Sequence, residues 1–462
     1  MTRIVRYLIL FLAIIFSTDM ALAQVSEQIR GLHKVKRKET IFGIARQYDI
    51  QIEDLIQANP EMRKPEYELK KGDVIRIPYP KGTAPAIVTP TPTVQAPVTT
   101  SAISSKADDV RERAIRVGVM LPLHNINGDG RRMVEYYRGI LMACDSLKQL
   151  GISVDLHAWN TPEDGNISTV LADQAAAECD IIFGPLYSKQ MDALSNFVTA
   201  HDIRLVIPFS ISAPQLLTNR NIFQIWQSPT NINDATITHF LERFSNYHPV
   251  FIDCNDSTSK KGNFTFGLRR QLENRQIEYS VTNLKSSENA FSKAFSQTKP
   301  NIVILNTARS PELGVAFAKI NSLKFSLPNI NITMFGYTEW LMYTRTHLDN
   351  FYKYNTYIPS VFYYNPLSSQ TTRLEQKYRW NFHEDMQQSL PRFAITGFDH
   401  AQYFLRGLRR YGRNFTGEAG TVSYPAAQTP LQFTRIGNGG MQNHALLFVR
   451  YMPERRIVII DK

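Results

Sequence analysis

The chain has 462 residues, a length that suggests two to four domains. Its 43% hydrophobic and 20% charged residues are ordinary for a globular protein. The formal net charge of +11 is spread along the chain without a long basic run, so we expect no nucleic-acid partner, although this charge is compatible with attraction to anionic envelope polymers.

Residues 1–23 have the pattern of a cleavable signal peptide. Two arginines supply the positive end, residues 7–16 form an apolar run too short to span a bilayer, and residues 21–23 fit the small-x-small cleavage pattern. Because Gln24 rather than a cysteine follows, we expect no lipid attachment there. No later stretch is apolar for about eighteen residues, so we predict a periplasmic mature chain without a transmembrane segment. The alternative is a segment that stays uncleaved as a membrane anchor.

The three cysteines, Cys144, Cys179 and Cys254, are too few and too scattered for a disulfide framework. Each lies in or beside an apolar segment. We expect buried thiols, and oxidation of one pair in a periplasm is the alternative.

Residues 33–80 have the pattern strand, helix, helix, strand. Ile41, Ile44, Ala45 and Tyr48 recur at helical spacing, and Thr40 before them is suited to cap the helix. A second, shorter apolar stripe follows and ends before a proline, which disfavours a helical residue in front of it. A glycine then turns the chain into a closing strand.

This segment resembles a lysin motif (LysM), the module that binds glycans containing N-acetylglucosamine. The matching features are the entry over 35–41, Ile44-Ala45, Leu55, Asn59-Pro60, Leu69, Gly72 and Ile77-Pro78. Two positions depart from the usual pattern, since Lys38-Glu39 stands in place of Gly-Asp and Gln51 in place of a serine or threonine.

The resemblance implies a glycan groove between residues 38–42 and 57–61. Such a groove needs polar groups for acetamido oxygens and apolar surface for sugar faces. Our candidate glycan-binding residues are Thr40, Ile41, Asn59 and Pro60. The alternative is that Asn59 and Pro60 only cap the helix and that Ile41 belongs to the core.

Residues 81–112 are rich in Pro, Thr, Ala, Val and Ser and lack the aromatic residues that a core requires. We predict a linker. It would reach about 90 Å as polyproline II and about 30 Å as a flexible coil.

Residues 113–462 alternate apolar strands with amphipathic helices. We predict strands over 115–121 and 301–305, for example, and a helix over 170–179. Such repeated βα units predict an α/β fold with parallel, doubly wound sheets. Two successive series suggest two lobes, at about 113–235 and 236–360, with a ligand cleft between them. We expect the chain to cross between lobes near 229–236, near 357–366, and again before terminal strands at 431–449 and 456–460. We expect 127–131 to be a flexible cleft loop.

The ordered landmarks of this region resemble type I periplasmic-binding-protein-like domains, the fold of branched-chain amino acid receptors. They are Val117-Gly-Val-Met-Leu-Pro122, Phe183-Gly-Pro-Leu-Tyr-Ser188, Val206-Ile-Pro-Phe-Ser-Ile-Ser212, residues 225–229, Phe335-Gly336 and Thr396-Gly-Phe-Asp399. The family also includes lipoprotein activators of penicillin-binding proteins.

The resemblance implies ligand binding at strand ends that face the cleft. In the first lobe the candidates are Ser188, where a helix begins and an anion could bind, together with Ser210 and Ser212. In the second lobe Asp253 and Asn306 follow strands and could meet an amine, as could Asp256. The alternative is that these side chains cap helices and turns.

Catalytic motifs are missing from the sequence. His383-Glu384 lacks the second histidine of H-E-x-x-H, and no G-x-S-x-G elbow is present. Cys254 and His248 lie at opposite ends of one predicted strand. We therefore predict a non-enzymatic envelope protein without cofactor or metal. It would be anchored to peptidoglycan and bind an envelope protein or a small amino-acid-like ligand, as an accessory of wall synthesis. The alternatives are a solute receptor of an ABC transporter and a cell-wall hydrolase.

Overall fold

The computed structural model describes residues 29–35, 39–48, 50–59, 62, 69–78, 109–209, 211, 213–418, 422 and 424–461. The chain divides into two compact units, 1–102 and 103–462, and this boundary falls within the predicted linker. The predicted signal peptide and residues 81–108 of the linker lie outside the described residues. None of the helices within the described ranges offers a stretch long and apolar enough to cross a membrane.

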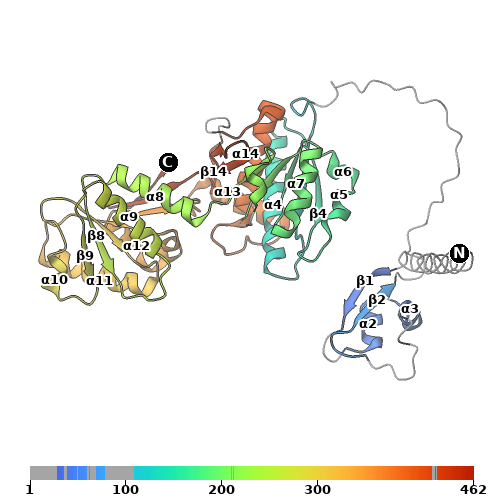
Figure 1. The fold of residues 1–462 in the computed structure, drawn as a ribbon, viewed down its shortest axis with the longest axis horizontal. Coiled ribbons are helices and arrows are strands. Elements are labelled where there is room, and N and C mark those ends of the chain that lie inside the picture. Colours follow the sequence, from blue (N-terminus) through green and yellow to red (C-terminus); the bar gives the residue numbers. More distant parts are fainter. Residues whose placement is uncertain are drawn as a thin grey trace, which may run out of the picture. The chain divides into compact units, whose positions relative to one another are not determined.

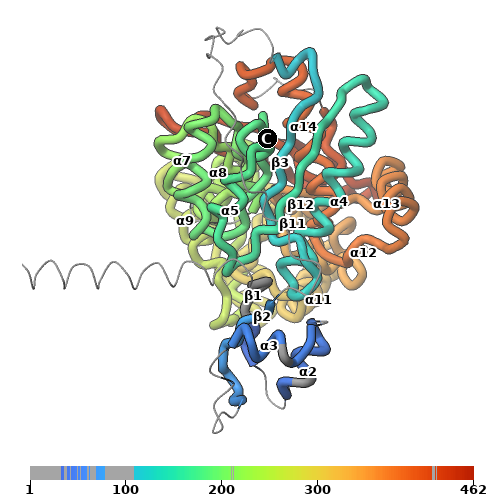
Figure 2. The backbone as a smooth tube through the Cα atoms, turned by 90° about the vertical axis from the view of Figure 1, so that its right-hand side faces the viewer, coloured from blue at the N-terminus to red at the C-terminus, as the bar shows by residue number. Residues whose placement is uncertain are grey.

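The N-terminal unit is a two-stranded sheet with two helices. Strand β1 (Ile29–Lys34) pairs antiparallel with β2 (Val74–Pro78), and α2 (Ile41–Gln47) and α3 (Ile52–Ala58) lie between them in sequence. Figures 1 and 2 show both helices beside this strand pair. The predicted apolar stripes meet in one small core, formed by Val35, Ile44, Ala45, Ile50, Leu55, Met62, Ile75 and Ile77. The predicted order of strand, helix, helix and strand is therefore confirmed.

The C-terminal unit contains two seven-stranded sheets, each the centre of one lobe, as the sequence predicted (Figure 1). The first-lobe sheet has the order β13-β14-β7-β6-β5-β3-β4, and all its pairs are parallel except β13–β14. Its strands are β3 (Ile115–Leu121), β4 (Val154–Asn160), β5 (Ile181–Phe183), β6 (Arg204–Ile207), β7 (Ile222–Gln224), β13 (Phe433–Arg435) and β14 (Met441–Asn443).

Helices cover both faces of the first-lobe sheet because its strands are apolar on both sides. Along β5, for example, Ile181 and Phe183 face one core and Ile182 faces the other. The first core is closed by α4 (Gly128–Lys148), α13 (Ser369–Phe382) and α14 (Phe393–Tyr411). The second is closed by α5 (Ile167–Leu171), α6 (Gln174–Ala177) and α7 (Met191–Ala200). Short 3₁₀ helices add η3 (Ser188–Gln190), η4 (Pro214–Leu217) and η6 (Gly412–Asn414).

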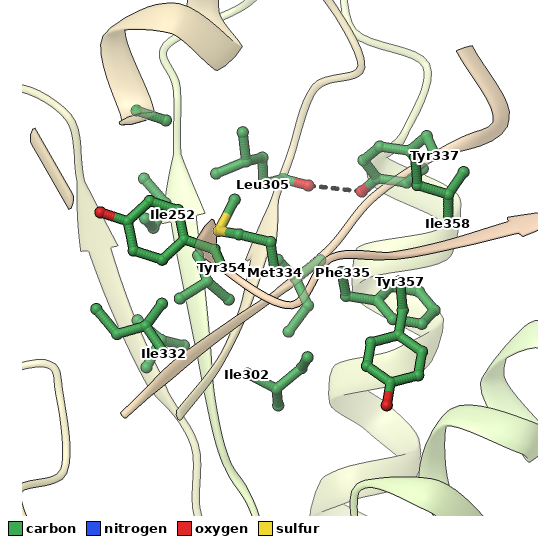
Figure 3. Packing of buried hydrophobic residues seen from close by; sticks show 14 of the residues in the cluster. Ile252, Ile302, Leu305, Ile332, Met334, Phe335, Tyr337, Tyr354, Tyr357 and Ile358 are labelled. Atoms are coloured by element: carbon green, nitrogen blue, oxygen red, sulfur yellow. Dashed lines mark hydrogen bonds between the residues drawn. The ribbon is translucent and has the colours of Figure 1, made fainter. Parts of the chain in front are cut away.

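The second-lobe sheet has the order β16-β15-β12-β11-β10-β8-β9. Its strands are β8 (His248–Asp253), β9 (Ser280–Asn283), β10 (Asn301–Leu305), β11 (Ile332–Phe335), β12 (Tyr357–Ser360), β15 (Leu447–Met452) and β16 (Arg456–Asp461). Its helices are α8 (Pro229–Arg243), α9 (Gly262–Asn274), α10 (Glu288–Ser292), α11 (Ser310–Ser326), η5 (Thr338–Tyr343) and α12 (Thr344–Lys353). Figure 3 shows its buried aliphatic and aromatic core, in which the Tyr337 hydroxyl donates to the Leu305 carbonyl at 2.5 Å.

Described segments cross between the lobes after β7, after β12 and after β14. The first crossing lies near the expected place, since α8 packs into the second-lobe core from Ile237 onward. The third differs from the prediction, because β13 and β14 belong to the first lobe and only β15 and β16 to the second. Apolar alternation identifies a strand but does not indicate which sheet it joins.

Two local predictions in the first lobe were wrong. Residues 127–131 are not a loop but the start of α4, where the Asn127 side chain caps the helix by accepting from the Gly130 N–H at 2.8 Å. The single helix predicted over 170–179 is two short ones, because Asp173 caps α6 by accepting from the Ala175 N–H at 3.0 Å. In both places an Asx cap, rather than the apolar stripe, sets the helix start.

Candidate functional site

Thr40 and Ile41 lie together at the start of α2. The Thr40 hydroxyl accepts a hydrogen bond from the Gly43 N–H at 3.1 Å, which satisfies one of the free donors of the first turn. Thr40 is exposed and Ile41 is half-buried against the core. Both side chains therefore have surface that a glycan could contact, while Thr40 also has the capping role expected of it.

Asn59 has an internal role in the N-terminal unit. Its side chain is 0% exposed, and its amide donates to the carbonyls of Leu55 at 2.8 Å and Arg76 at 2.7 Å. Its oxygen accepts from the Arg76 N–H at 2.7 Å. These bonds join the end of α3 to β2, so the Asn59 side chain belongs to the fold rather than to the groove surface. Pro60 lies outside the described residues.

Asn59→Ala is expected to destabilise the N-terminal unit by about 3 kcal/mol, because the Arg76 N–H and two carbonyls lose their partner. Asn59→Asp keeps an acceptor for the Arg76 N–H, but it places a carboxylate oxygen against the two carbonyls in a buried position, so it should cost at least as much at neutral pH. Hydrogen exchange of the full chain at α3 and β2 measures both effects. Gln47→Ala, at an exposed position in α2, is the control. Unchanged exchange at Arg76 in Asn59→Ala would contradict this role.

One buried histidine, which was not predicted from the sequence, joins the segment before α2 to the end of that helix. His33, 6% exposed, contacts the Tyr48 hydroxyl through Nδ1 at 2.8 Å and Glu39 through Nε2 at 2.8 Å. The contact fixes Glu39, which stands at one of the two positions departing from the lysin-motif pattern. Its partners are 6 and 15 residues away in sequence, so helical or strand spacing gives no signal for it.

In the second lobe, Asp253 and Asn306 do come together at the carboxyl ends of β8 and β10. Asp253 Oδ1 accepts from Asn306 Nδ2 at 2.8 Å and from the Asn255 N–H at 2.9 Å, and Asn306 Oδ1 accepts from the Cys254 N–H at 2.8 Å. Asn283 at the end of β9 adds a bond of 3.2 Å to Asp253 Oδ2. The two candidate side chains lie side by side, but their hydrogen bonds join neighbouring strand ends to one another.

The Asp256 carboxylate also has its hydrogen-bond partners within the fold. Its carboxylate accepts from the hydroxyls of Thr258 at 2.6 Å and Thr307 at 2.7 Å, and Arg309 lies 3.5 Å away. The hydroxyl hydrogen bonds, assisted by Arg309, lower the pKa of Asp256 to about 2. This carboxylate holds a turn after β8, which is the alternative raised for it from the sequence.

In the first lobe, Ser188 is exposed and begins η3 directly after the cis Gly184-Pro185 bond and a short loop. Ser210 and Ser212 lie outside the described residues. The described residues near these positions are largely apolar. Leu186, Tyr187 and Phe209 line a cavity of about 600 Å³ at the carboxyl ends of β5 and β6. A site at this sheet edge would therefore bind a ligand with substantial apolar surface.

The described cysteines show no activation for nucleophilic catalysis. Cys144, Cys179 and Cys254 are free, and burial raises the pKa of each thiol to about 12. His248 contacts the Ser280 hydroxyl at 2.9 Å, at the end of β8 opposite Cys254. Among the described residues, no group of three or more His, Cys, Asp or Glu side chains could hold a metal ion.

Comparison with known proteins identifies the N-terminal unit. Residues 33–78 match the LysM domain, which confirms the resemblance inferred from the sequence. No curated protein matches the chain.

Solved structures resemble the C-terminal unit. A putative branched-chain amino acid ABC transporter from Rhodospirillum rubrum has 13% identity, with 75% of this chain and 100% of that one covered and a TM-score of 0.50. A branched chain amino acid ABC transporter periplasmic ligand-binding protein from Burkholderia xenovorans has 12% identity, coverage of 75% and 94%, and a TM-score of 0.42. Full-length LpoA from Haemophilus influenzae has 12% identity, coverage of 75% and 59%, and a TM-score of 0.48. At such identity the likeness concerns the fold, that of type I periplasmic binding proteins.

Proposed function

We propose that this chain, a LysM domain joined to a two-lobe unit with the periplasmic-binding-protein fold, is a non-enzymatic protein of the bacterial cell envelope. The LysM domain holds it on peptidoglycan. The two-lobe unit binds a protein partner or a small ligand, as an accessory of cell-wall synthesis. The predicted signal peptide and linker fit this role, since they would export the chain and let the two-lobe unit reach out from a wall-bound domain.

The observation that carries the proposal is the LysM match over 33–78. The described residues of this range form two helices and a strand pair around one apolar core, with a capped α2 and hydrogen bonds from Asn59 that join α3 to β2. The unactivated thiols argue against a cysteine-dependent wall hydrolase. Release of soluble fragments from purified sacculi would contradict the non-enzymatic role.

The mature protein is expected to co-sediment with purified sacculi, and deletion of residues 33–80 is expected to abolish this. The reason is that the deletion removes the glycan-binding domain and leaves the two-lobe unit intact. A matched deletion of residues 84–103 within the linker should still pellet. A soluble N-acetylglucosamine oligosaccharide should compete. Unchanged pelleting of the 33–80 deletion would refute the anchor.

The second candidate is a receptor that delivers amino acids to an ABC transporter, and the Rhodospirillum rubrum structure favours it. Two points weigh against it. Attachment to the wall would restrict diffusion to a permease. Asp253 and Asn306 also form their hydrogen bonds with each other and with the backbone at strand ends, rather than facing a ligand as free groups. A thermal-shift screen of free amino acids discriminates the two. A tight ligand at 100 times its Kd would add about 2.7 kcal/mol of stability, and such a result would favour the receptor.

A further inference from the structure

The cavity at the edge of the first-lobe sheet contains an unusual polar group. The cavity has a volume of about 600 Å³, within the range of small-molecule sites. His400, on α14, lines it and is only 1% exposed. Its Nδ1 lies 3.0 Å from the Tyr136 hydroxyl, whereas its buried Nε2 has no hydrogen-bond partner among the described residues. Buried polar atoms of this kind are normally satisfied.

The hydrogen bond to Tyr136 determines which nitrogen of His400 carries the proton. The Tyr136 side chain is 0% exposed, and its hydroxyl makes no other hydrogen bond with the described residues. A hydroxyl that donated to nothing would leave a buried donor unsatisfied, so it donates to Nδ1. Burial lowers the pKa of His400 to about 3, which keeps the imidazole neutral. A neutral ring that accepts at Nδ1 carries its hydrogen on Nε2. The Nε2–H of His400, a residue that lines the cavity, therefore has no acceptor within the described part of the chain.

Thr429 contributes a second such group. Its hydroxyl oxygen is buried without a hydrogen-bond partner in the described part of the chain, and the residue lines the same cavity. Its backbone N–H donates to Asp399 at 2.8 Å, and this bond holds the residue in place against α14. A hydroxyl can donate as well as accept, so the Thr429 side chain can donate a hydrogen bond to a ligand acceptor.

The rest of the cavity wall is mainly apolar and carries little charge. Phe209 packs edge-to-face on Tyr136 with ring centroids 5.2 Å apart, and it lies 5.7 Å from Phe393. Of the described lining residues, only Asp129 and Arg132 are fully charged, and they lie 3.5 Å from each other on the exposed first turns of α4. No buried charge is available for the ammonium group of a free amino acid.

We propose that this cavity binds a small, mainly apolar or aromatic molecule with an oxygen acceptor, which receives a hydrogen bond from the Nε2–H of His400 and a second from the Thr429 hydroxyl. The aromatic walls take up the apolar body, and the two donors fix its orientation. This inference rests on the proposed ligand-binding role of the two-lobe unit and names the chemical class of ligand.

The test uses the full chain and three probes of similar size. Phenylacetamide has a carbonyl acceptor, phenethylamine has none when protonated, and leucine is a zwitterion. Binding is followed by Trp226 fluorescence, since this residue lines the cavity and is part exposed, and by the ¹⁵N–H signal of His400 in histidine-labelled protein. Phenylacetamide is expected to bind and to shift that signal, and the other two probes are expected to bind at least tenfold more weakly.

Two variants keep the test independent of folding defects. His400→Phe and Thr429→Val should each weaken phenylacetamide binding by about tenfold, the cost of one hydrogen bond. Thr218→Val, an exposed change of the same kind, should leave it unchanged. Equal binding of phenethylamine, stronger binding of leucine, unchanged affinity in both variants, or no binding of any probe, as for a cavity that holds only water, would overturn the inference. Sedimentation with sacculi is measured in parallel, because its loss would instead refute the wall-bound function.

Discussion

Replacing Gly397 or Gly139 by alanine is expected to destabilise the first lobe by about 3 kcal/mol or more. The two glycines let α14 and α4 approach backbone to backbone. A Cβ on Gly139 would lie 1.9 Å from the Ala394 carbonyl oxygen, and one on Gly397 would lie 2.0 Å from the Tyr136 carbonyl oxygen. Because these obstacles are backbone atoms, no change of rotamer can relieve the clash, and the helices must move apart.

This expectation is tested by denaturant unfolding of the full chain, with hydrogen exchange at α4 and α14 to assign the loss to the first lobe. Gly314→Ala in α11 is the matched control. Its Cβ would meet only the His347 ring at 3.6 Å, an ordinary contact, and alanine is the better helix former by about 1 kcal/mol. Gly314→Ala should therefore keep or raise stability. A wild-type unfolding midpoint for both Gly139→Ala and Gly397→Ala would show that the helices do not require this close approach.

Asp399→Ala is expected to cost on the order of 4 kcal/mol and to free the segment from Tyr424 to Thr429. The Asp399 side chain is 0% exposed and accepts four hydrogen bonds, each of 2.8 Å, from the Tyr424 hydroxyl and the N–H groups of Ala427, Gln428 and Thr429. Burial raises the pKa of Asp399 to about 6, and the donors counter part of this rise, so the carboxylate is ionised at pH 7.5. Its removal leaves donors unsatisfied in a buried place.

Asp399→Asn should also be strongly destabilising at pH 7.5, because an amide presents only one oxygen to donors that now engage two. Thermal unfolding and hydrogen exchange at 424–429 measure both variants. Asp385→Asn is the control, since this exposed aspartate pairs with Arg379 at the surface and should matter by less than about 1 kcal/mol. Because Asp399 also positions Thr429, its variants should weaken phenylacetamide binding. Hydrogen exchange at 424–429 that stays at the wild-type rate in Asp399→Ala would contradict this role of Asp399.

The sequence predicted well those features that depend on local periodicity. Strand β3 and strand β10 have the predicted bounds, since each is a short, mainly apolar run followed by a polar or turn residue. The LysM domain was recognisable because its short motif combines a cap, two stripes and turn residues. Prediction was poorer where an Asx cap extends or divides a helix, as at Asn127 and Asp173.

The candidate sites divide in the same manner. The position of Asp253 and Asn306 at one sheet edge followed from parallel topology alone, because the carboxyl ends of neighbouring parallel strands meet. The hydrogen bonds that these two side chains form between strand ends could not be predicted, because they depend on which donors the fold brings near. The same holds for Asn59, whose partner Arg76 lies 17 residues away.

The sequence by itself therefore determined the modular order, the α/β class and the LysM identity, because hydrophobic period, capping residues and turn residues are local properties. The tertiary structure alone decided which sheet the last strands join and which polar side chains form their hydrogen bonds within the fold. It also brought His400 and Tyr136 together from 264 positions apart. Close packing at Gly139 and Gly397 brings α4 and α14 near enough for that contact. The Nε2–H of His400 has no acceptor among the described residues, and no sequence pattern predicts this arrangement.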